Sequence, residues 1–212
     1  METNGPYPAD GSNSASGSVS NILTASGIVR SDIRSSFGSS TTTAQGVPLS
    51  LTVTVVNSNS ACSPLVGYAV YVWHCTREGL YSLYTVPAEN YLRGVQVTDS
   101  NGQVTFQSIY PGCYSGRYPH IHFEIYPTLA LATSYTNNVL TSQMAMPRDI
   151  CTAVYNGASG YSASVTNLAG VTTSSDNVFN SSTAAQLAAQ TPSLSGSVAN
   201  GYTGTIQIGI AV

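Results

Sequence analysis

Two histidines separated by one residue, His120 and His122, are the first candidates for chemistry. They lie in a run predicted to be a strand, where residues two apart point to the same face. Both imidazoles would then project together, while Ile121 and Phe123 enter the opposite face. This spacing predicts a two-point chelate for a transition metal, a role that imidazole fills well. A lone pair of this kind is also compatible with a structural role or with zinc or copper.

Two tyrosines are candidate partners for the histidines. Tyr81 follows Gly79 and Leu80, and Tyr114 ends the run Pro111-Gly112-Cys113-Tyr114. The chain has 14 tyrosines, so either residue taken alone is more often a packing residue whose hydroxyl finds a partner.

Arg117 and Gln143 are candidates for contact with a substrate. Arg117 precedes His120 by three residues. Without the histidines nearby, it could equally well be an ordinary surface cation. Gln143 is also compatible with satisfying a buried backbone group. The remaining histidine, His74, follows Trp73 on an expected core strand and is interpreted as structural or as a support for the site.

Together these residues belong to an ordered set of motifs that resembles the intradiol ring-cleavage dioxygenases. The motifs are, in chain order, Glu2-x2-Gly5-Pro6-Tyr7, Arg30-x-Asp32-Ile33, Trp73-His74-x4-Gly79-x-Tyr81, Leu92-Arg93-Gly94, Thr98-Asp99-x2-Gly102, Pro111-Gly112-x-Tyr114, Arg117-x2-His120-Ile121-His122-Phe123 and Leu140-Thr141-Ser142-Gln143. They run discontinuously from residue 2 to residue 147, and the chain beyond residue 156 is only loosely similar.

The resemblance implies one non-haem Fe(III) per chain, with four ligands: Tyr81, Tyr114, His120 and His122. It implies that Arg117 faces the substrate, that Gln143 lies beside it, and that Tyr114 is the ligand that leaves when substrate binds. The implied reaction adds both atoms of O₂ to a catechol-type diol and cleaves the ring between the hydroxylated carbons, giving a cis,cis-muconate-type diacid.

This ligand set makes chemical sense for a hard trivalent cation. Two tyrosinates and one hydroxide neutralise its three charges, and a bound metal ion deprotonates tyrosine at neutral pH, far below its usual pKa of about 10. The histidines supply neutral nitrogen donors whose other ring nitrogens should be held by acceptors nearby.

The sequence departs from better-known members of this family in two ways. It lacks their long N-terminal helical dimerisation segment, and only five residues separate Tyr114 from His120, where the catechol and aromatic-acid enzymes have a longer loop. The shorter loop implies a more open site. Only Arg93 and Arg117 in the motifs could meet a substrate carboxylate, which favours neutral catechols over protocatechuate.

Two other function classes stay open. A secreted, metal-free β-sandwich that binds glycans fits the Ser/Thr/Tyr-rich composition but leaves the histidine pair and Arg117 unexplained. A copper or zinc oxidoreductase on a β-fold uses the histidines but leaves Tyr81 and Tyr114 idle.

Charge is scarce in this chain. Its 212 residues include six arginines, nine acidic residues and no lysine, and the charged share of 7% is well below the roughly 25% of ordinary soluble proteins. The formal net charge of −3 is not that of a nucleic-acid binder, and the apolar runs are too short for a transmembrane helix. We therefore expect neither nucleic acid nor a membrane as a partner, and the family resemblance implies a small aromatic diol and O₂.

Short strands between turn-forming clusters predict an all-β fold, an antiparallel β-sandwich with long irregular N- and C-terminal segments and few short helices. The expected strands are 49–55, 66–74, 103–108, 120–126, 139–146 and 206–210, and the expected short helices are 147–155 and 184–190. Leu49, Leu51, Val53 and Val55 alternate with polar residues, the pattern of a half-buried strand.

We expect one domain over residues 1–212. Residues 1–46, rich in Ser, Gly, Thr and Asn, are predicted to be an extended arm over it. Residues 47–155 would form the catalytic core, and residues 156–212 a polar loop followed by a terminal strand.

Four cysteines allow two disulfides, which would suit an oxidising compartment. We predict Cys75–Cys113, which would tie together the two tyrosine segments, and Cys62–Cys151. A polar stretch follows Met1 directly, so we predict a secreted chain whose leader has been removed.

Overall fold

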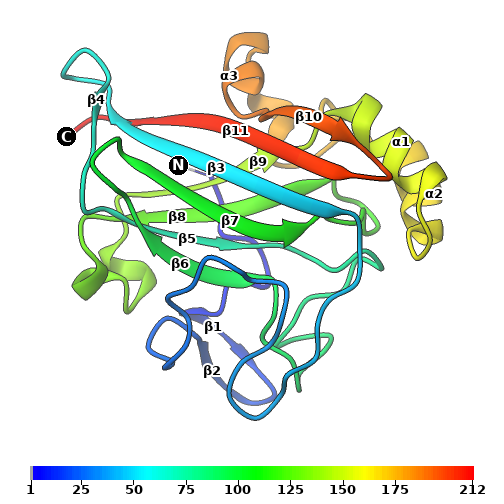
Figure 1. Ribbon diagram of the computed structural model, residues 1–212, viewed down its shortest axis with the longest axis horizontal. Helices are drawn as coiled ribbons and strands as arrows, with labels where there is room; N and C mark the ends of the chain where they lie inside the picture. The colour runs from blue at the N-terminus through cyan, green and yellow to red at the C-terminus, as the bar shows by residue number, and fades with distance from the viewer. Residues whose placement is uncertain (1) are drawn as a thin grey trace.

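A computed structural model describes residues 2–212 of the chain, which fold as two β-sheets packed face to face (Figure 1). The larger sheet has the order β10 (Ser193–Ser197), β11 (Gly201–Ile210) and β3 (Pro48–Asn57), and β3 also pairs with β7 (Gln103–Ile109) and with the short β4 (Ser63–Pro64). The smaller sheet has the order β6 (Arg93–Val97), β5 (Ala69–Trp73), β8 (His120–Tyr126) and β9 (Leu140–Ala145). A separate hairpin joins β1 (Asp10–Ala15) to β2 (Ser18–Asn21).

The main hydrophobic core lies between the two sheets. The alternation predicted for β3 is confirmed, because Leu49, Leu51, Val53 and Val55 are at most 2% exposed. They belong to one cluster with residues of β8 that include Ile121 and Phe123. The all-β sandwich expected from the sequence is therefore confirmed.

The smaller sheet is buried on both faces. Every residue of β5 and β8 is buried. On its outer face, Ile22, Leu23 and Ile28 of the N-terminal segment form a second cluster with Tyr71 and Trp73. Because successive residues of a strand point to opposite faces, alternate residues of β8 enter this second interior.

One strand pair departs from the expected antiparallel arrangement. β11 runs parallel to β3, from Tyr202 beside Leu49 to Ile210 beside Asn57. Parallel neighbours need a long crossover, and the chain between these strands supplies the whole smaller sheet and the helices. β11 thus lies in the middle of the larger sheet, although the sequence placed it outside the core segment 47–155.

α1 (Arg148–Gly157) and α2 (Ser162–Ala169) lie at one end of the sandwich, and α3 (Ala184–Ala189) lies beyond β11 (Figure 1). The short 3-10 turns are η1 (Leu129–Leu131), η2 (Tyr135–Asn137) and η3 (Phe179–Ser181). η1 and η2, which come between β8 and β9, lie toward the opposite end from α1 and α2. The predicted helices 147–155 and 184–190 are confirmed within two residues at each end. The sequence did not predict α2 or the strands β1, β2, β4, β6 and β10. The predicted strand 66–74 begins too early, because Gly67 turns the chain at a φ of +80° before β5 starts at Ala69.

Neither predicted disulfide forms, because all four cysteines are free. Cys62 is exposed in the turn between β3 and β4, whereas Cys151 is buried on α1 with its sulfur 3.2 Å from the Tyr110 hydroxyl. The Cys62–Cys151 pairing is therefore wrong.

The predicted Cys75–Cys113 disulfide is also absent, for a different reason. Both thiols are buried, but each points at a backbone carbonyl, Cys75 Sγ at Gly112 and Cys113 Sγ at Arg117, each at 3.5 Å. The secreted location stays a prediction, now without the disulfides on which it partly depended.

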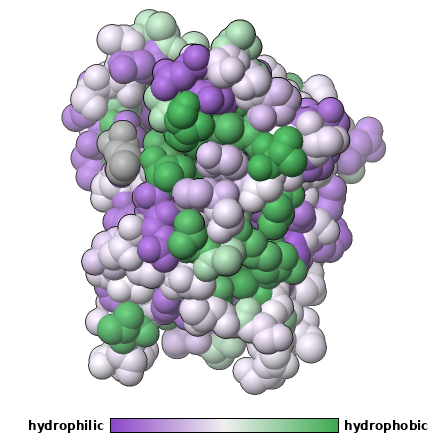
Figure 2. Space-filling model, turned by 90° about the vertical axis from the view of Figure 1, so that its left-hand side faces the viewer, coloured by the Kyte–Doolittle hydropathy of each residue, from purple (hydrophilic) through white to green (hydrophobic). Residues whose placement is uncertain are grey.

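Some large apolar side chains reach the surface. Figure 2 shows the face at the left of Figure 1, where hydrophobic residues gather between polar ones. Exposed apolar residues include Val66, Leu129 and Leu131, and none of the histidines or tyrosines singled out from the sequence is among them. Within residues 2–212, no helix has both the length and the apolar character needed to cross a bilayer.

Candidate metal centre

His120 and His122 lie side by side on the outer face of β8. Their Nε2 atoms are 2.9 Å apart, and both side chains are buried. Ile121 and Phe123 point the other way, into the core between the sheets. The alternation predicted from the His-x-His spacing is thus present.

Each imidazole is held differently. His120 Nδ1 donates to the carbonyl oxygen of Tyr118 at 2.5 Å, which leaves the Nε2 lone pair of His120 free for a ligand bond. The His122 ring stacks on Trp73, with centroids 4.8 Å apart and planes 5° apart. The acceptor expected for its other nitrogen is missing, because His122 Nδ1 is buried without a partner among the described residues.

The N-terminal segment closes over His122. Gly5 has a φ of +71°, and a Cβ built there would lie 2.9 Å from His122 Cε1. We therefore expect Gly5→Ala to displace His122 and to weaken binding of the iron expected from the sequence by about 10-fold or more, as loss of a ligand's support typically does. Gly17→Ala is the matched control, since Gly17 has a φ of +82° but nothing within 4 Å. Equal iron affinities for the two variants, measured by competition with a chelator, would show that Gly5 does not shape the site.

Both candidate tyrosines lie beside the histidine pair. The Tyr114 hydroxyl is 3.2 Å from His120 Nε2. The Tyr81 ring meets Tyr114 edge-on, with centroids 5.6 Å apart, and lies 6.1 Å from the His122 ring. A Cβ at Gly79 would lie 3.1 Å from the Tyr114 Cβ, so this glycine lets the two tyrosine loops approach one another.

The protein groups by themselves keep the four side chains neutral. Burial raises the pKa of Tyr114 to about 12 and raises the pKa of Tyr81 well above its ordinary value. Burial also lowers the pKa of His120 to about 3 and holds the pKa of His122 well below its usual range. A cation placed among these groups would reverse the preference of the phenols, because a bound metal ion drives deprotonation of its ligands.

This donor set fits a hard trivalent cation. The Tyr81 hydroxyl is buried and has no hydrogen-bond partner among residues 2–212, a costly arrangement unless the oxygen has another partner. His120 Nε2 lies within hydrogen-bond distance of both the Tyr114 hydroxyl, at 3.2 Å, and His122 Nε2, at 2.9 Å. Over the described chain, no group of three or more His, Cys, Asp and Glu side chains is arranged for a metal. The phenol oxygens of Tyr81 and Tyr114 are the further donors beside the two histidines.

Arg117 lies at the edge of this cluster and is paired with an acid that the sequence did not single out. Its Nε donates to Asp176 Oδ2 at 2.8 Å, and its Nη2 contacts Gln143 Oε1 at 2.5 Å. Asp176 belongs to the segment predicted to be a polar loop.

Gln143 links Arg117 to the N-terminal segment. It lies directly opposite His122 in the β8–β9 pairing. Its Oε1 accepts from Arg117, and its Nε2 donates to the Thr3 carbonyl at 3.1 Å. The side-chain amide is therefore fixed in one orientation.

Two residues considered from the sequence have structural roles. His74 contacts the Cys75 carbonyl at 2.8 Å and Ser108 Oγ at 2.6 Å. Arg93 is fully buried, and its nitrogens donate to the side chains or carbonyls of Tyr7, Pro8, Tyr71 and Ser82. Arg93 is thus committed to holding the N-terminal segment, which leaves Arg117 as the cation nearest to the cluster.

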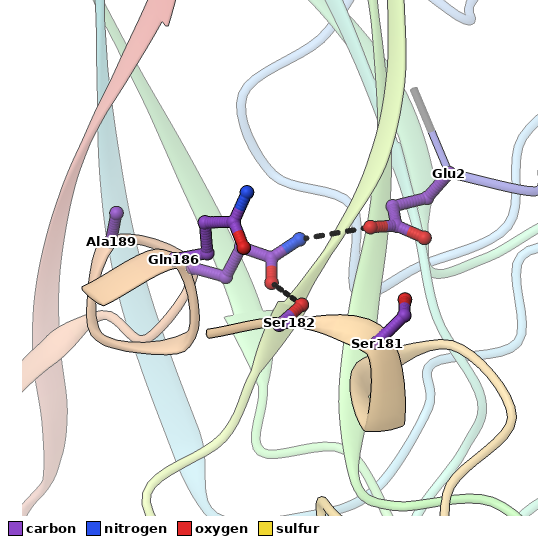
Figure 3. A pocket seen from close by; sticks show the side chains of 6 residues that line it. Glu2, Ser181, Ser182, Gln186 and Ala189 are labelled. Carbon is purple, nitrogen blue, oxygen red and sulfur yellow. Dashed lines mark hydrogen bonds between the residues drawn. The ribbon is translucent and has the colours of Figure 1, made fainter. Parts of the chain in front are cut away.

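A polar pocket of about 280 Å³ lies near the N-terminal segment (Figure 3). Glu2 lines one side, and Ser181, Ser182 and Gln186 line the other. Gln190 donates toward Glu2 at 3.5 Å and accepts from Ser182 at 3.1 Å. None of the four candidate ligands lines this pocket.

Comparison with solved structures shows where this fold occurs. An intradiol ring-cleavage dioxygenase from Tetranychus urticae is similar, with a TM-score of 0.69, 24% identity and 87% of each chain covered. The dioxygenase domain of a carbohydrate-binding fusion protein from Streptomyces sp. SirexAA-E has a TM-score of 0.55 and 24% identity, over 87% of this chain and 88% of that one. Hydroxyquinol 1,2-dioxygenase from Pseudomonas putida DLL-E4 has a TM-score of 0.53 and 15% identity, over 95% of this chain and 68% of that one.

A family model described as Dioxygenase matches residues 31–178. The chain belongs to the intradiol ring-cleavage dioxygenase family. The matched part of this intradiol dioxygenase contains Tyr81, Tyr114, His120, His122 and the Arg117–Asp176 pair. A search of proteins with curated functions gave no match.

Proposed function

We propose that this dioxygenase holds one Fe(III) per chain through Tyr81, Tyr114, His120 and His122, and cleaves a catechol-type ring between its two hydroxylated carbons. Ferric iron bound there would supply a Lewis acid and template for the diol and its reaction with O₂. The expected product is a cis,cis-muconate-type diacid.

The observation that supports this proposal most strongly is the convergence of two phenols and two imidazoles in one buried cluster. Tyr81 has no hydrogen-bond partner for its oxygen in the described chain, and the two histidines present Nε2 atoms to each other. Zinc or copper would need only the histidines and would leave two phenols unexplained. A glycan-binding surface would be exposed, whereas His120, His122 and Tyr81 are at most 2% exposed.

The two tyrosines differ in burial, which supports different roles for them in the proposed reaction. Tyr81 is sealed beneath Tyr7, whose ring centroid is 4.7 Å away. Tyr114 is only half-buried and lies on the loop before β8. Tyr114 Oη is therefore the group that would accept a proton from the incoming diol and move aside, while Tyr81 stays in place.

Arg117 would stabilise negative charge that develops on the substrate oxygens. Its guanidinium is fixed by Asp176 and Gln143, so its remaining N–H groups are oriented before substrate arrives. Preorganised donors of this kind are effective because they need not reorganise during the reaction.

A panel of catechols tests the proposal. Iron-loaded protein should consume one O₂ per diol and release a ring-opened diacid from catechol, methylcatechols or hydroxyquinol, with slower turnover of protocatechuate. Protein that contains iron yet consumes no O₂ with any member of the panel would contradict the proposed reaction. Activity restored by copper or zinc instead would favour the other class of oxidoreductase.

A further inference from the structure

Asp176 is a fully buried carboxylate at the edge of the candidate site, and its side chain is 0% exposed. Its Oδ2 accepts from Arg117 Nε and from the Tyr118 backbone N–H, both at 2.8 Å, and its Oδ1 accepts from the Val178 N–H at 2.8 Å. Longer contacts reach Oδ1 from Arg117 Nη2 at 3.4 Å and from the Phe179 N–H at 3.2 Å.

These contacts keep Asp176 charged. Burial acts to raise the pKa of Asp176, but the hydrogen bonds from Arg117 and from the Tyr118 and Val178 amides outweigh it, so the net pKa lies below the ordinary value. The pair of Asp176 and Arg117 therefore carries no net charge, although Arg117 is the cation closest to the candidate ligands.

The same pair leaves Arg117 with a restricted set of donors. Nε and Nη2 are occupied by Asp176 and Gln143, while Nη1 makes no hydrogen bond to the described residues. The Arg117 side chain keeps 11% exposure. It can therefore donate hydrogen bonds from Nη1 to a substrate oxygen, but it does not offer the unpaired positive charge that would favour binding of a carboxylate.

Asp176 also reaches one of the candidate ligands through the backbone. The Tyr118 N–H donates a hydrogen bond to Asp176, and the Tyr118 carbonyl oxygen accepts one from His120 Nδ1. The peptide groups around Tyr118 thus connect the carboxylate to the orientation of His120.

We propose that Asp176 is a positioning residue that makes this site selective for uncharged catechols, because it cancels the charge of Arg117 while holding its guanidinium in place. This inference rests on the proposed ring-cleaving function. A carboxylated catechol would have to draw Arg117 away from Asp176, and an acid left buried without its partner is strongly unfavourable.

The variant Asp176→Asn tests the inference, because it removes the charge and keeps the shape. We expect the ratio of kcat/KM for protocatechuate to kcat/KM for catechol to rise by about 10-fold, mainly through a lower KM for the acid. Binding of the uncleaved analogues 4-hydroxybenzoate and phenol, followed by spectral titration of iron-loaded protein, should shift in the same direction. Asp149→Asn is the control, because Asp149 is exposed on α1, and it should leave the ratio unchanged.

A measurement on the wild type covers the case in which Asp176→Asn does not fold. Because the Arg117–Asp176 pair is neutral, the ratio of kcat/KM for protocatechuate to kcat/KM for catechol should change little between low and high salt. An uncompensated arginine would instead attract the carboxylate less as salt screens its charge, and the ratio would fall. A steep fall of the ratio with salt, a wild-type preference for the acid, or an unchanged ratio in folded Asp176→Asn would each overturn the inference.

The two proposals fail separately. Wild-type protein that cleaves catechol while Asp176→Asn keeps its selectivity refutes only the role of Asp176. Wild-type protein that cleaves no diol, but whose analogue binding shows the expected change in Asp176→Asn, refutes ring cleavage and leaves the charge-cancelling role in place.

Discussion

Tyr81→Phe should abolish stoichiometric iron binding while leaving the metal-free fold at least as stable as the wild type. The change removes one oxygen that is buried and unpartnered in the described chain. A buried polar atom without a partner costs about 1–3 kcal/mol, so its loss should not destabilise the metal-free protein. The same change removes an anionic ligand, and we expect iron affinity to fall by more than the roughly 10–100-fold typical of supporting residues.

Thermal unfolding with and without iron, together with iron content, measures this effect. Tyr161→Phe is the control, because the Tyr161 hydroxyl donates to the Tyr110 carbonyl at 2.8 Å and accepts from the Val47 N–H at 3.1 Å. Tyr161→Phe should lower the stability of the protein equally with and without iron, and it should leave the iron content unchanged. Normal iron binding by Tyr81→Phe would remove Tyr81 from the ligand set. His122→Ala should also lose iron, with an added loss of packing against Trp73.

Arg117→Ala should keep its iron and lose turnover by about 10²–10³-fold, the usual effect of removing a preorganised charge-stabilising donor. The Arg117 side chain is not needed to hold the metal, because its hydrogen bonds go to Asp176 and Gln143 rather than to the side chains of the four candidate ligands. Steady-state O₂ uptake and iron content of the same preparation separate the two effects.

Folding needs its own control in this experiment. Removing Arg117 leaves Asp176 buried without its ion pair, and breaking such a pair costs up to about 3–5 kcal/mol. The double variant Arg117→Ala/Asp176→Asn removes both charges and should regain part of this stability without regaining turnover. Full activity in either folded variant would show that Arg117 does not act on the substrate.

Local sequence patterns predicted the parts of the site that depend on strand periodicity. The spacing of His120 and His122 and their β-strand context were enough to place both imidazoles on one face, because side-chain direction alternates along a strand. The alternation of Leu49 to Val55 gave the core face of β3 in the same way. The positions of Tyr81 and Tyr114 depended on the family motifs, since both lie on loops without such periodicity.

Contacts between segments that are far apart in the chain could not be predicted from local sequence patterns. Asp176 meets Arg117 across 59 positions, and it lies among small polar residues with no local pattern. The one available signal was the scarcity of charge, since the chain has only nine acidic residues to pair with its six arginines. The direction of β11 beside β3 and the separation of Cys62 from Cys151 likewise depend on how the whole chain folds back.

Visible absorption tests most directly whether two tyrosinates and two histidines hold one ferric ion. Purified or iron-loaded protein should be red to burgundy through charge transfer from tyrosinate to Fe(III), with one iron per chain, and Tyr81→Phe should lack this colour. A wild-type protein that stays colourless, contains no iron and resists loading with ferric or ferrous salts would show that these four side chains do not form a ferric site.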